Sequence, residues 1–527
     1  MMPQIGKVLA LFAVLFMLAS PQGASAEGPR GGFDDAFGPR FHPDTRPAPA
    51  DSKHRPRHGS DRASSVRHWN QVAIDASGLD HTPVAPEENR VFGEQLGPGR
   101  AARAMAIVHL AIFEVVNAVE GDYKSYIGLS HAKLGTSQQV GVAQAAHDTL
   151  AALFPSQAAS FDTLLAEELD EIPEGRLKTN GTALGKRAAS AILAARANDG
   201  SQRPEPHVNI EFLTSNEPGK WRQDPISLIP LALGAYWDEV KPFVLERADQ
   251  FRVPPPPALD SPAYAVAFNE VKAIGGCGNN PADCVGGSPT PTERTAEQSQ
   301  IGIYWAYDGT PSLCAPPRLY NQITMQIAHK MGTDNDALEI ARLLALVNVA
   351  MADAGIAVWE SKYYYQYWRP ITGIREADEL TGPSGLGDSN PATAGDPIYS
   401  PLGAPASNLT GPNFTPPFPA YPSGHAGFGG ALFEMLRNFY RTDRIPFTFV
   451  SDEFNGVTRD HAGNVRPLVE RHFSSLSQAE EENGQSRIYL GIHWSFDKTE
   501  GIAQGRRVAD YVFKHTMQSR HQRGDGR

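Results

Sequence analysis

The sequence predicts an all-α fold, mainly from the spacing of its apolar residues. Apolar side chains recur every three to four residues over several long segments, as expected of helices that bury one face. We find no series of alternating segments at regular spacing, which the strands of a sandwich or barrel would require. At 527 residues the chain is longer than one hydrophobic core usually supports, so we expect two lobes.

Six segments carry the helical pattern. The longest is Asp336–Trp368, although its Tyr363–Tyr365 run disfavours the last turns. The other five are Arg100–Val119, Gln144–Phe154, Ala183–Ala197, Gly424–Tyr440 and Gly501–His515. Short apolar pieces near Phe447–Val450 are expected to pair only locally. Pro and Gly gather in long loops, above all residues 371–424, and a loop of that length is usually functional or disordered.

The N-terminal end predicts a signal peptide over residues 1–26. Lys7 precedes the apolar run Val8–Leu18, and Ala24–Ala26 offers a small-x-small cleavage site. About eleven apolar residues are too few to span a bilayer. We therefore expect a secreted or periplasmic protein, and no later stretch is expected to cross a membrane.

Composition sets the remaining boundaries. Residues 27–66 are rich in Pro, Gly, Arg, Asp and His, which predicts a disordered leader because such a segment cannot build a core. Ordered structure is expected to begin near Trp69. We expect an N-terminal helical bundle over 67–330, a C-terminal one over 331–517, and a polar tail over 518–527.

The net charge and the cysteines narrow the class of protein. A formal charge of −12 argues against a nucleic-acid partner, but a few focused cations can still bind an anion. Cys277 and Cys284 flank a loop that contains Gly, Asn and Pro, which fits a disulfide. A metal site, the alternative, needs more ligands than the loop provides. Cys314 is expected to be buried and unreactive.

The first chemically notable segment is Lys362, six residues, then Arg369-Pro370. Seven positions are close to two helical turns, so both cations are expected to project from one helix face, with Pro370 ending the helix. Taken alone, such a pair is more often a solvated surface.

The second segment is Pro422-Ser423-Gly424-His425, at the start of an apolar helix. Ser423 is a good N-cap, and Gly424 lets an anion approach the free N–H groups of the first turn. An ordinary capped helix is the alternative, but it leaves His425 beside the positive helix end unexplained.

The third segment is Ser486-Arg487, five residues, His493, three residues, Asp497. If His493 and Asp497 lie on one helix, the carboxylate can orient the imidazole. Arg487 adds a planar, permanently charged fork suited to an oxyanion. The alternative is an ordinary Asp–His pair on the protein surface. Together, however, the three segments supply the cations, imidazoles and small donors needed to enclose a highly charged oxyanion.

These three segments resemble, position for position, the signature shared by vanadium haloperoxidases and type-2 acid phosphatases. The signature covers residues 359 to 500, and the likeness extends upstream through Ile303–Gly309 and the helix that contains His109. It implies an all-α fold of two helical bundles. It also suggests that Asp308 pairs with Arg369 or Arg487.

The resemblance also implies roles for the site residues. His493 would be the ligand of vanadium, and His425 the acid/base facing the apical oxygen. Lys362 would also polarise the peroxide. The residues that would hydrogen-bond the vanadate oxygens are Lys362, Arg369, Ser423, Gly424 and Arg487.

The flanking residues favour the peroxidase branch. Residues 414–430 are similar to the fungal chloroperoxidase segment, with Phe418 where algal bromoperoxidases usually have His. Trp359 and the pair His493-Trp494 are similar to the chloroperoxidase too. An apolar wall of Trp359 and Phe418 would desolvate an incoming halide and keep His425 neutral. Simple core packing of the two aromatics is the alternative.

The sequence therefore predicts a vanadate-dependent haloperoxidase that uses hydrogen peroxide to oxidise chloride, bromide or iodide to hypohalous acid. Small organic acceptors would then be halogenated, and a homo-oligomer is possible. The alternative is a secreted acid phosphatase acting through a phosphohistidine. A non-catalytic oxyanion-binding protein is the third hypothesis, although binding alone does not require His425.

Overall fold

A computed structural model of the chain describes residues 32–43 and 62–520. Within these residues the chain forms fourteen α-helices, short 3₁₀ turns and two small two-stranded sheets. The predicted all-α fold is confirmed. The expected signal peptide, residues 1–26, lies outside the described residues.

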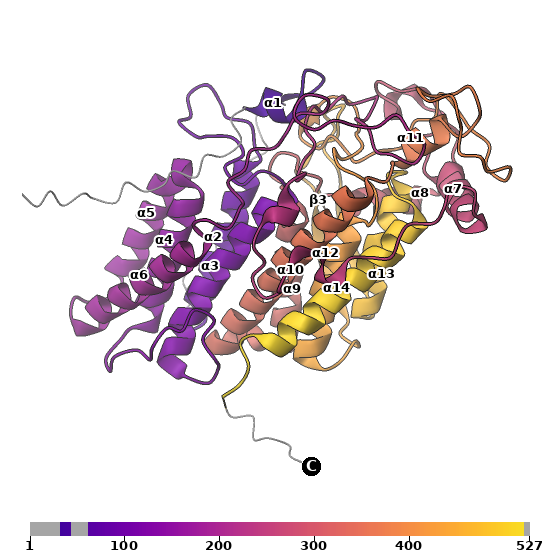
Figure 1. The fold of residues 1–527 in the computed structure, drawn as a ribbon. Coiled ribbons are helices and arrows are strands. Elements are labelled where there is room, and N and C mark those ends of the chain that lie inside the picture. The colour runs from indigo at the N-terminus through magenta and orange to yellow at the C-terminus, as the bar shows by residue number, and fades with distance from the viewer. Residues whose placement is uncertain (1–31, 44–61, 521–527) are drawn as a thin grey trace, which may run out of the picture.

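The helices form two groups that lie side by side. Figure 1 shows α2–α6 in indigo and purple next to the orange and yellow helices α9, α10 and α12–α14. The helices are α1 (Phe33–Phe37), α2 (Ser64–Asp80), α3 (Gly97–Glu120), α4 (Gln138–Leu153), α5 (Ala158–Asp170), α6 (Arg176–Arg196), α7 (Pro262–Ile274), α8 (Ala296–Tyr304), α9 (Pro316–Met331), α10 (Ala337–Tyr365), α11 (Pro370–Arg375), α12 (Gly424–Tyr440), α13 (Leu476–Tyr489) and α14 (Ser495–His515).

The two sheets are small and antiparallel. Strand β1 (His42–Pro43) pairs with β2 (Leu409–Thr410), and β3 (Phe447–Asn455) pairs with β4 (Leu468–Phe473). The second pair contains the apolar segment that was expected to pair locally. Neither sheet forms a layer of its own. Four phenylalanines of the second pair nevertheless pack into the helical core: Phe447, Phe449, Phe454 and Phe473.

All six predicted helices are present, and five of them have at least one shifted end. The largest differences are at the starts of α4, α6 and α14, which lie six or seven residues before the predicted ones. Helix α10 ends three residues early, at Tyr365, because Gln366 adopts a left-handed conformation (φ 51°) and donates its N–H to the Lys362 carbonyl. At the end of α3, Gly121 takes the same region (φ 93°), as a glycine stop does. The local periodicity therefore predicted where the helices are, but not the cap of α10.

The leader is partly folded, which corrects the expectation of disorder over 27–66. Phe33 and Phe37 stack in α1, and Phe37 and Phe41 both pack edge-on against Phe414. This segment has few aliphatic residues, but aromatic rings spaced four residues apart supply the apolar contact area that folding requires. Helix α2 likewise begins at Ser64, earlier than expected.

Two helices correct the expectation that no later stretch could cross a membrane. By length and composition alone, helices α3 and α10 could each cross a membrane, because each contains an 18-residue window with a mean hydropathy of 1.6. In the structure 94 % and 100 % of those windows are buried, because α3 and α10 pack against each other at the centre of the molecule. They are apolar all round because other helices surround them.

Close contact between α12 and α14 brings the starts of these two helices together. A Cβ on Gly505 would lie 2.0 Å from the Gly427 carbonyl oxygen, so only glycine fits at this crossing. At the same end, the Ser423 N–H donates to the Asp497 carbonyl at 3.0 Å. The second and third notable segments of the sequence are thereby held side by side.

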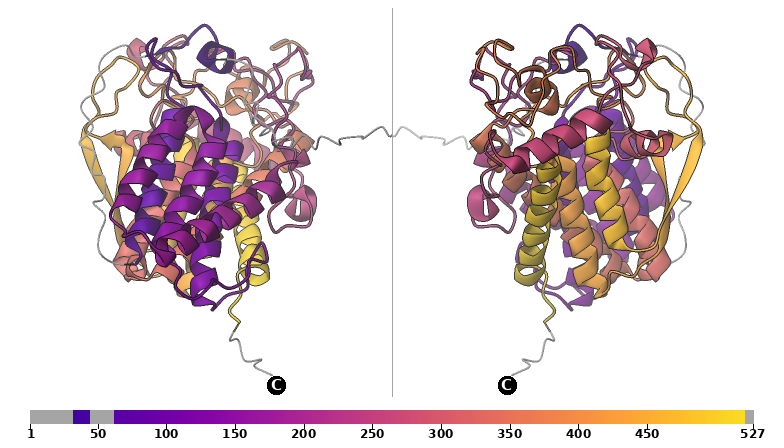
Figure 2. Two further views of the ribbon diagram at one scale, coloured as in Figure 1. Left: turned by 90° about the vertical axis from the view of Figure 1, so that its left-hand side faces the viewer. Right: turned by 90° about the vertical axis from the view of Figure 1, so that its right-hand side faces the viewer.

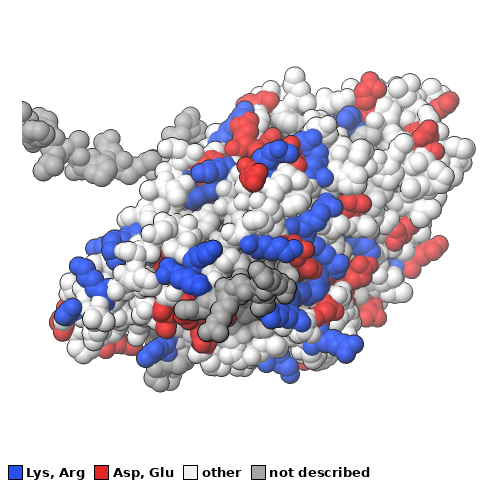
Figure 3. All heavy atoms as spheres, turned by 60° about the horizontal axis from the view of Figure 1, so that its bottom comes forward, with Lys and Arg blue, Asp and Glu red and all other residues white. Residues whose placement is uncertain are grey.

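The long loops gather at one end of the molecule, where α1, α7 and α11 also lie (Figures 1 and 2). A disulfide between Cys277 and Cys284 closes one of these loops, as predicted, and Cys314 is buried. The opposite end, shown in Figure 3, carries Lys and Arg side chains intermingled with Asp and Glu. The loop-rich end is the one that contains the candidate site.

Candidate functional site

The three notable segments converge at the loop-rich end of the C-terminal helices. The C-terminal ends of α10 and α13 meet the N-terminal ends of α12 and α14 there. Every predicted oxyanion-binding side chain is buried, none more than 6 % exposed. These side chains are Lys362, Arg369, Ser423, His425, Arg487 and His493, with Gly424 buried among them.

Lys362 is held by backbone carbonyls from the last turn of α10. Its Nζ donates to the carbonyl oxygens of Pro419 (2.8 Å), Ala420 (2.9 Å) and Pro422 (2.5 Å). All three N–H groups are used, so a hydrogen bond to an oxyanion requires exchange of one of them. Burial lowers the pKa of Lys362 well below its usual value, and the charge of Arg369 lowers it further.

Arg369 does not lie on the same helix as Lys362, which corrects the prediction of a shared helix face. Gln366 ends α10, and Arg369 is the N-cap of the next helix, α11. The turn between them nevertheless directs Arg369 into the site. Its Nε donates to the Phe418 carbonyl and its Nη1 to the Ile492 carbonyl, each at 2.9 Å.

The tautomer of His493 follows from its two neighbours. Arg369 Nη1 lies 2.9 Å from His493 Nε2, and an arginine can only donate, so Nε2 carries the lone pair. The Nδ1–H group then donates to Asp497 Oδ2 at 2.8 Å. Burial lowers the pKa of His493 well below its usual value, with Arg369 and Lys362 adding to the effect. A neutral imidazole with a directed Nε2 lone pair is the form that binds a metal centre.

Asp497 was predicted to orient His493 from the same face of one helix, but the two residues do not lie on one helix. His493 precedes α14, and Asp497 lies in its first turn, where Oδ2 also accepts the Trp494 N–H at 3.0 Å. The predicted contact is present, but a helix-start turn brings it about. Burial raises the pKa of Asp497 to about 7.

The start of α12 matches the prediction for its segment. Ser423 is the N-cap, and its Oγ accepts the Ala426 N–H at 3.4 Å, a contact that leaves the hydroxyl proton free to donate. Next to it, His425 Nε2–H donates to the Ala306 carbonyl, so Nδ1 is the basic nitrogen. Burial lowers the pKa of His425 well below its usual value, and the nearby Arg487 lowers it further.

Arg487 supplies the unused hydrogen-bond donors of the site. Its Nη2 donates to both carboxylate oxygens of Asp308, at 2.7 and 2.8 Å. Of the two predicted partners of Asp308, the structure therefore shows Arg487. Within residues 32–43 and 62–520, Arg487 Nε and Nη1 are buried without a hydrogen-bond partner. Orphaned guanidinium donors of this kind are costly unless an acceptor joins them.

These observations fit an oxyanion and not a bare cation. Three cations face only two carboxylates, Asp308 and Asp497, and burial raises the pKa of both. The described part of the chain contains no cluster of three or more His, Cys, Asp or Glu that could hold a metal ion. An anion with several oxygens would satisfy Arg487 and offset the excess positive charge.

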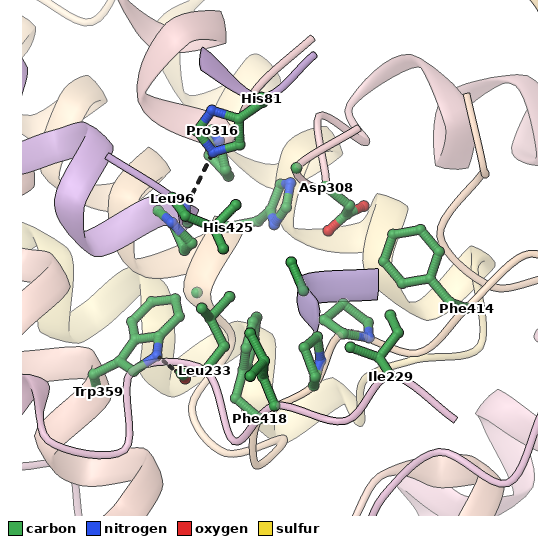
Figure 4. Close-up of a pocket in the computed structure, with 18 of the residues that line it drawn as sticks. His81, Leu96, Ile229, Leu233, Asp308, Pro316, Trp359, Phe414, Phe418 and His425 are labelled. Atoms are coloured by element: carbon green, nitrogen blue, oxygen red, sulfur yellow. Dashed lines mark hydrogen bonds between the residues drawn. The ribbon is translucent and has the colours of Figure 1, made fainter. Parts of the chain in front are cut away.

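An apolar cavity opens beside these charged groups. Its empty space amounts to about 730 Å³ when the open solvent at its mouth is included, and Trp359, Phe418, His425 and His493 are among its lining residues. The rings of Trp359 and Phe418 lie 4.9 Å apart, and Lys362 Nζ is 5.1 Å from the Phe418 ring centre. Figure 4 shows Trp359, Leu233 and Phe418 on one side of this cavity and Phe414 and Ile229 on another.

Sequence reasoning missed most of this cavity and one buried ion pair behind it. Glu453 on β3 accepts the Tyr307 N–H at 3.4 Å and pairs with Arg466, supporting the loop that presents Asp308. Burial raises the pKa of Glu453 to about 7. No sequence spacing connects Glu453 with Asp308, because the strand and the loop meet only in the fold.

Fold and site together define an all-α protein with a buried, cation-lined pocket whose donors fit an oxyanion. The family described as the VCPO second helical-bundle domain matches residues 342–522. Vanadium chloroperoxidase of Curvularia inaequalis is 29 % identical over 505 residues, which cover 81 % of this chain and 78 % of that protein.

Solved structures agree with this match. A bacterial vanadium-dependent iodoperoxidase superposes with a TM-score of 0.64 at 23 % identity, over 86 % of this chain and 96 % of its own. The holo-type bacterial vanadium-dependent chloroperoxidase gives 0.58 at 16 % identity, over 85 % and 96 %. The chain is thus similar to the vanadium haloperoxidases: it shares their helical fold, and its residues 342–522 match the family described as the VCPO second helical-bundle domain.

Proposed function

We propose that this protein is a vanadate-dependent haloperoxidase that oxidises halide with hydrogen peroxide to hypohalous acid. The observation that carries the proposal is the buried cluster of Lys362, Arg369 and Arg487 around the lone pair of His493 Nε2. When bound, vanadate would supply a Lewis acid that activates peroxide without changing its own oxidation state.

The chain's own residues would bind and orient this anion. His493 is placed to be the ligand, because Asp497 fixes its tautomer and Arg369 approaches the same nitrogen. The unused Arg487 donors and the Ser423 hydroxyl would hold the oxygens, together with Arg369 and the backbone at Gly424. Lys362 would join them by releasing one of its carbonyl partners, and would also polarise peroxide.

His425 would move protons at the mouth of the site. Its basic Nδ1 is neutral near pH 7 because burial and the surrounding cations lower its pKa. It can therefore accept a proton from peroxide on arrival and return one as the oxygen–oxygen bond breaks. Tyr320 and Asn483 hold its backbone carbonyl at 2.9 and 3.0 Å, which fixes its position.

For the halide, we propose that the aromatic wall permits chloride as well as bromide and iodide. Trp359 and Phe418 present ring surface beside Lys362, so a halide that enters loses hydration next to a cation. Chloride is the most strongly hydrated and the hardest to oxidise of the three, so it depends most on this wall. We also propose secretion, which the N-terminal pattern supports.

The test is halide oxidation by the purified protein with peroxide and a halogen-trapping dye, with and without orthovanadate. We expect dye halogenation only with vanadate. The His493→Ala variant should lose more activity than the roughly 10- to 100-fold that is lost when a residue supporting a metal ligand is removed. His472→Ala, at a side chain 72 % exposed on β4, is the matched control and should retain activity.

The same assay separates the alternatives. Chloride is run beside bromide, and Phe418→His should lower the chloride-to-bromide ratio of kcat/KM by on the order of tenfold. An unchanged ratio means that Phe418 only packs. No halogenation with any halide, together with vanadate-free release of phosphate from an aryl phosphate, would establish a phosphatase; the comparisons do not favour that outcome.

A further inference from the structure

The cavity beside the proposed vanadate site has a polar part and an apolar part. The polar part of its lining includes Asp308, His425 and Arg487. The rest of the wall is largely apolar and comes from segments far apart in the chain: Phe37, Leu96, Ile229, Leu231, Leu233 and Phe414. We call this apolar part the outer chamber. A channel for water-soluble peroxide and halide alone does not require so much apolar surface.

Helix α1 closes one side of the outer chamber. Ala36 and Phe37 line it, and Phe37 is held from behind by Phe33, with ring centres 4.8 Å apart. Asp35 in the same helix pairs with His207 at 2.9 Å. The pairing of β1 with β2 fixes the residues that follow. The wall is therefore a built part of the fold.

We propose that the outer chamber binds the organic acceptor, and that this acceptor is an uncharged, electron-rich aromatic molecule. The proposal rests on the haloperoxidase function proposed above. Apolar walls favour an uncharged ring, because a charged acceptor would lose hydration without a partner there. Phe37 and Phe414 offer ring surfaces for edge-on or offset contact with an aromatic guest.

The reaction balances without a further reagent. Peroxide, halide and one proton give hypohalous acid and water, with the halide oxidised by two electrons and peroxide reduced. The ring carbon then attacks the halogen, a carbon–halogen bond forms and the halogen–oxygen bond breaks. The ring proton leaves with the hydroxide as a second water. An acceptor seated in the outer chamber meets the hypohalous acid before bulk water does.

Binding can be measured without turnover, using 2-naphthol and the full protein without vanadate or peroxide. We expect saturable binding by calorimetry, and Phe37→Ala should weaken it by about fivefold, since it removes one ring contact. Phe513→Ala is the matched control, because it removes the same ring from a half-buried position on α14 that does not line the cavity. Ala36→Phe, which narrows the outer chamber, should also weaken binding.

Selectivity during turnover is the second readout. Equal amounts of 2-naphthol and its 6-sulfonate compete for bromination by the vanadate-loaded enzyme, and the product ratio is compared with that from reagent hypobromous acid. We expect the enzyme to favour the uncharged naphthol at least threefold beyond the reagent, and Phe37→Ala to reduce this preference.

The outcomes are separable. A ratio equal to that of the reagent, with no saturable 2-naphthol binding, would overturn the acceptor site while leaving the haloperoxidase proposal intact. Absence of halide oxidation would overturn the proposed function, and the vanadate-free binding series would still decide whether Phe37 and Ala36 form an aromatic-binding wall. Equal weakening by Phe513→Ala and Phe37→Ala would also contradict the proposal.

Discussion

At the scale of single residues, the site depends on hydrogen-bond partners that orient the side chains which would bind the anion. His493 presents a lone pair at Nε2 only because Asp497 accepts the proton at Nδ1. Asp497 in turn is fixed by the Trp494 N–H, and its own burial makes an isolated charge there costly. The imidazole is therefore oriented by a partner that never touches the anion.

This support predicts the effect of Asp497→Asn. An amide oxygen can still accept hydrogen bonds, but the amide also presents an NH₂ group and carries no charge, so it cannot enforce the Nδ1–H tautomer as a carboxylate does. We expect vanadate affinity to fall by roughly 10- to 100-fold. Titration of the vanadate-free protein with orthovanadate measures this directly, followed by protein fluorescence.

Glu500→Gln is the matched control for that titration, because Glu500 is a partly exposed acid on the same helix. It should change the affinity by less than a factor of about two, within the usual effect of a surface substitution. An Asp497→Asn variant that binds vanadate as tightly as the unaltered protein would contradict the proposed role of Asp497.

At the scale of elements, the crossing of α12 and α14 sets the geometry of the site. Gly427 and Gly505 let the two backbones approach so closely that no side chain fits between them. Ser423 and His493 stand at or just before the starts of these helices, so the same crossing fixes the distance between two halves of the oxyanion pocket.

The crossing predicts that Gly505→Ala destabilises the fold. The added methyl would meet the Gly427 carbonyl, which is backbone and cannot rotate away, so the helices must separate. We expect a loss of about 1–3 kcal/mol, the usual cost of overpacking, as a lower midpoint in urea unfolding. Arg507→Ala, exposed on the same helix, should stay within about 0.5 kcal/mol. Equal midpoints for the two variants would show that α14 shifts freely.

The elements also show what the sequence can and cannot predict. The helices were predictable because a helical stripe is a local pattern, and Gly424–Tyr440 was placed with both ends correct. The turn at Gln366 was not, since nothing in the aromatic run demands a left-handed residue there. The same limit applies to α1, whose few aromatic residues fold only against Phe92 and Phe414.

The residues of the site likewise divide into those that the sequence predicts and those that it does not. The oxyanion-binding residues were found because each lies in a short segment whose spacing is recognisable. The upstream resemblance suggests that Asp308 pairs with an arginine of the site, but only the fold decides between Arg487 and Arg369. The outer chamber had no signal, since Phe37, Leu231 and Phe414 come from three unrelated segments.

At the scale of the whole molecule, one continuous hydrophobic core spans both helix groups. It includes residues of α3 and α4 from one group and of α10 and α12 from the other. Helix α10 packs against α3 on one side and against α12 and α14 on the other. The expected boundary near residue 330 falls at the end of α9, a helix that contacts α3 as well as α10 and α12, and the cores of the two groups are joined through α10.

A joined core predicts that a ligand bound at one end stabilises both groups equally. Vanadate at 100 times its dissociation constant should add about 2.7 kcal/mol to the free energy of unfolding. Under conditions where amides exchange through global unfolding, hydrogen exchange should slow by the same factor in α4 and α6 as in α12 and α14. His493→Ala, which lacks the proposed ligand, should show no slowing in either group. Protection confined to α10–α14 would mean that the N-terminal helices unfold independently, and that the contact between α3 and α10 is too weak to transmit the stabilisation.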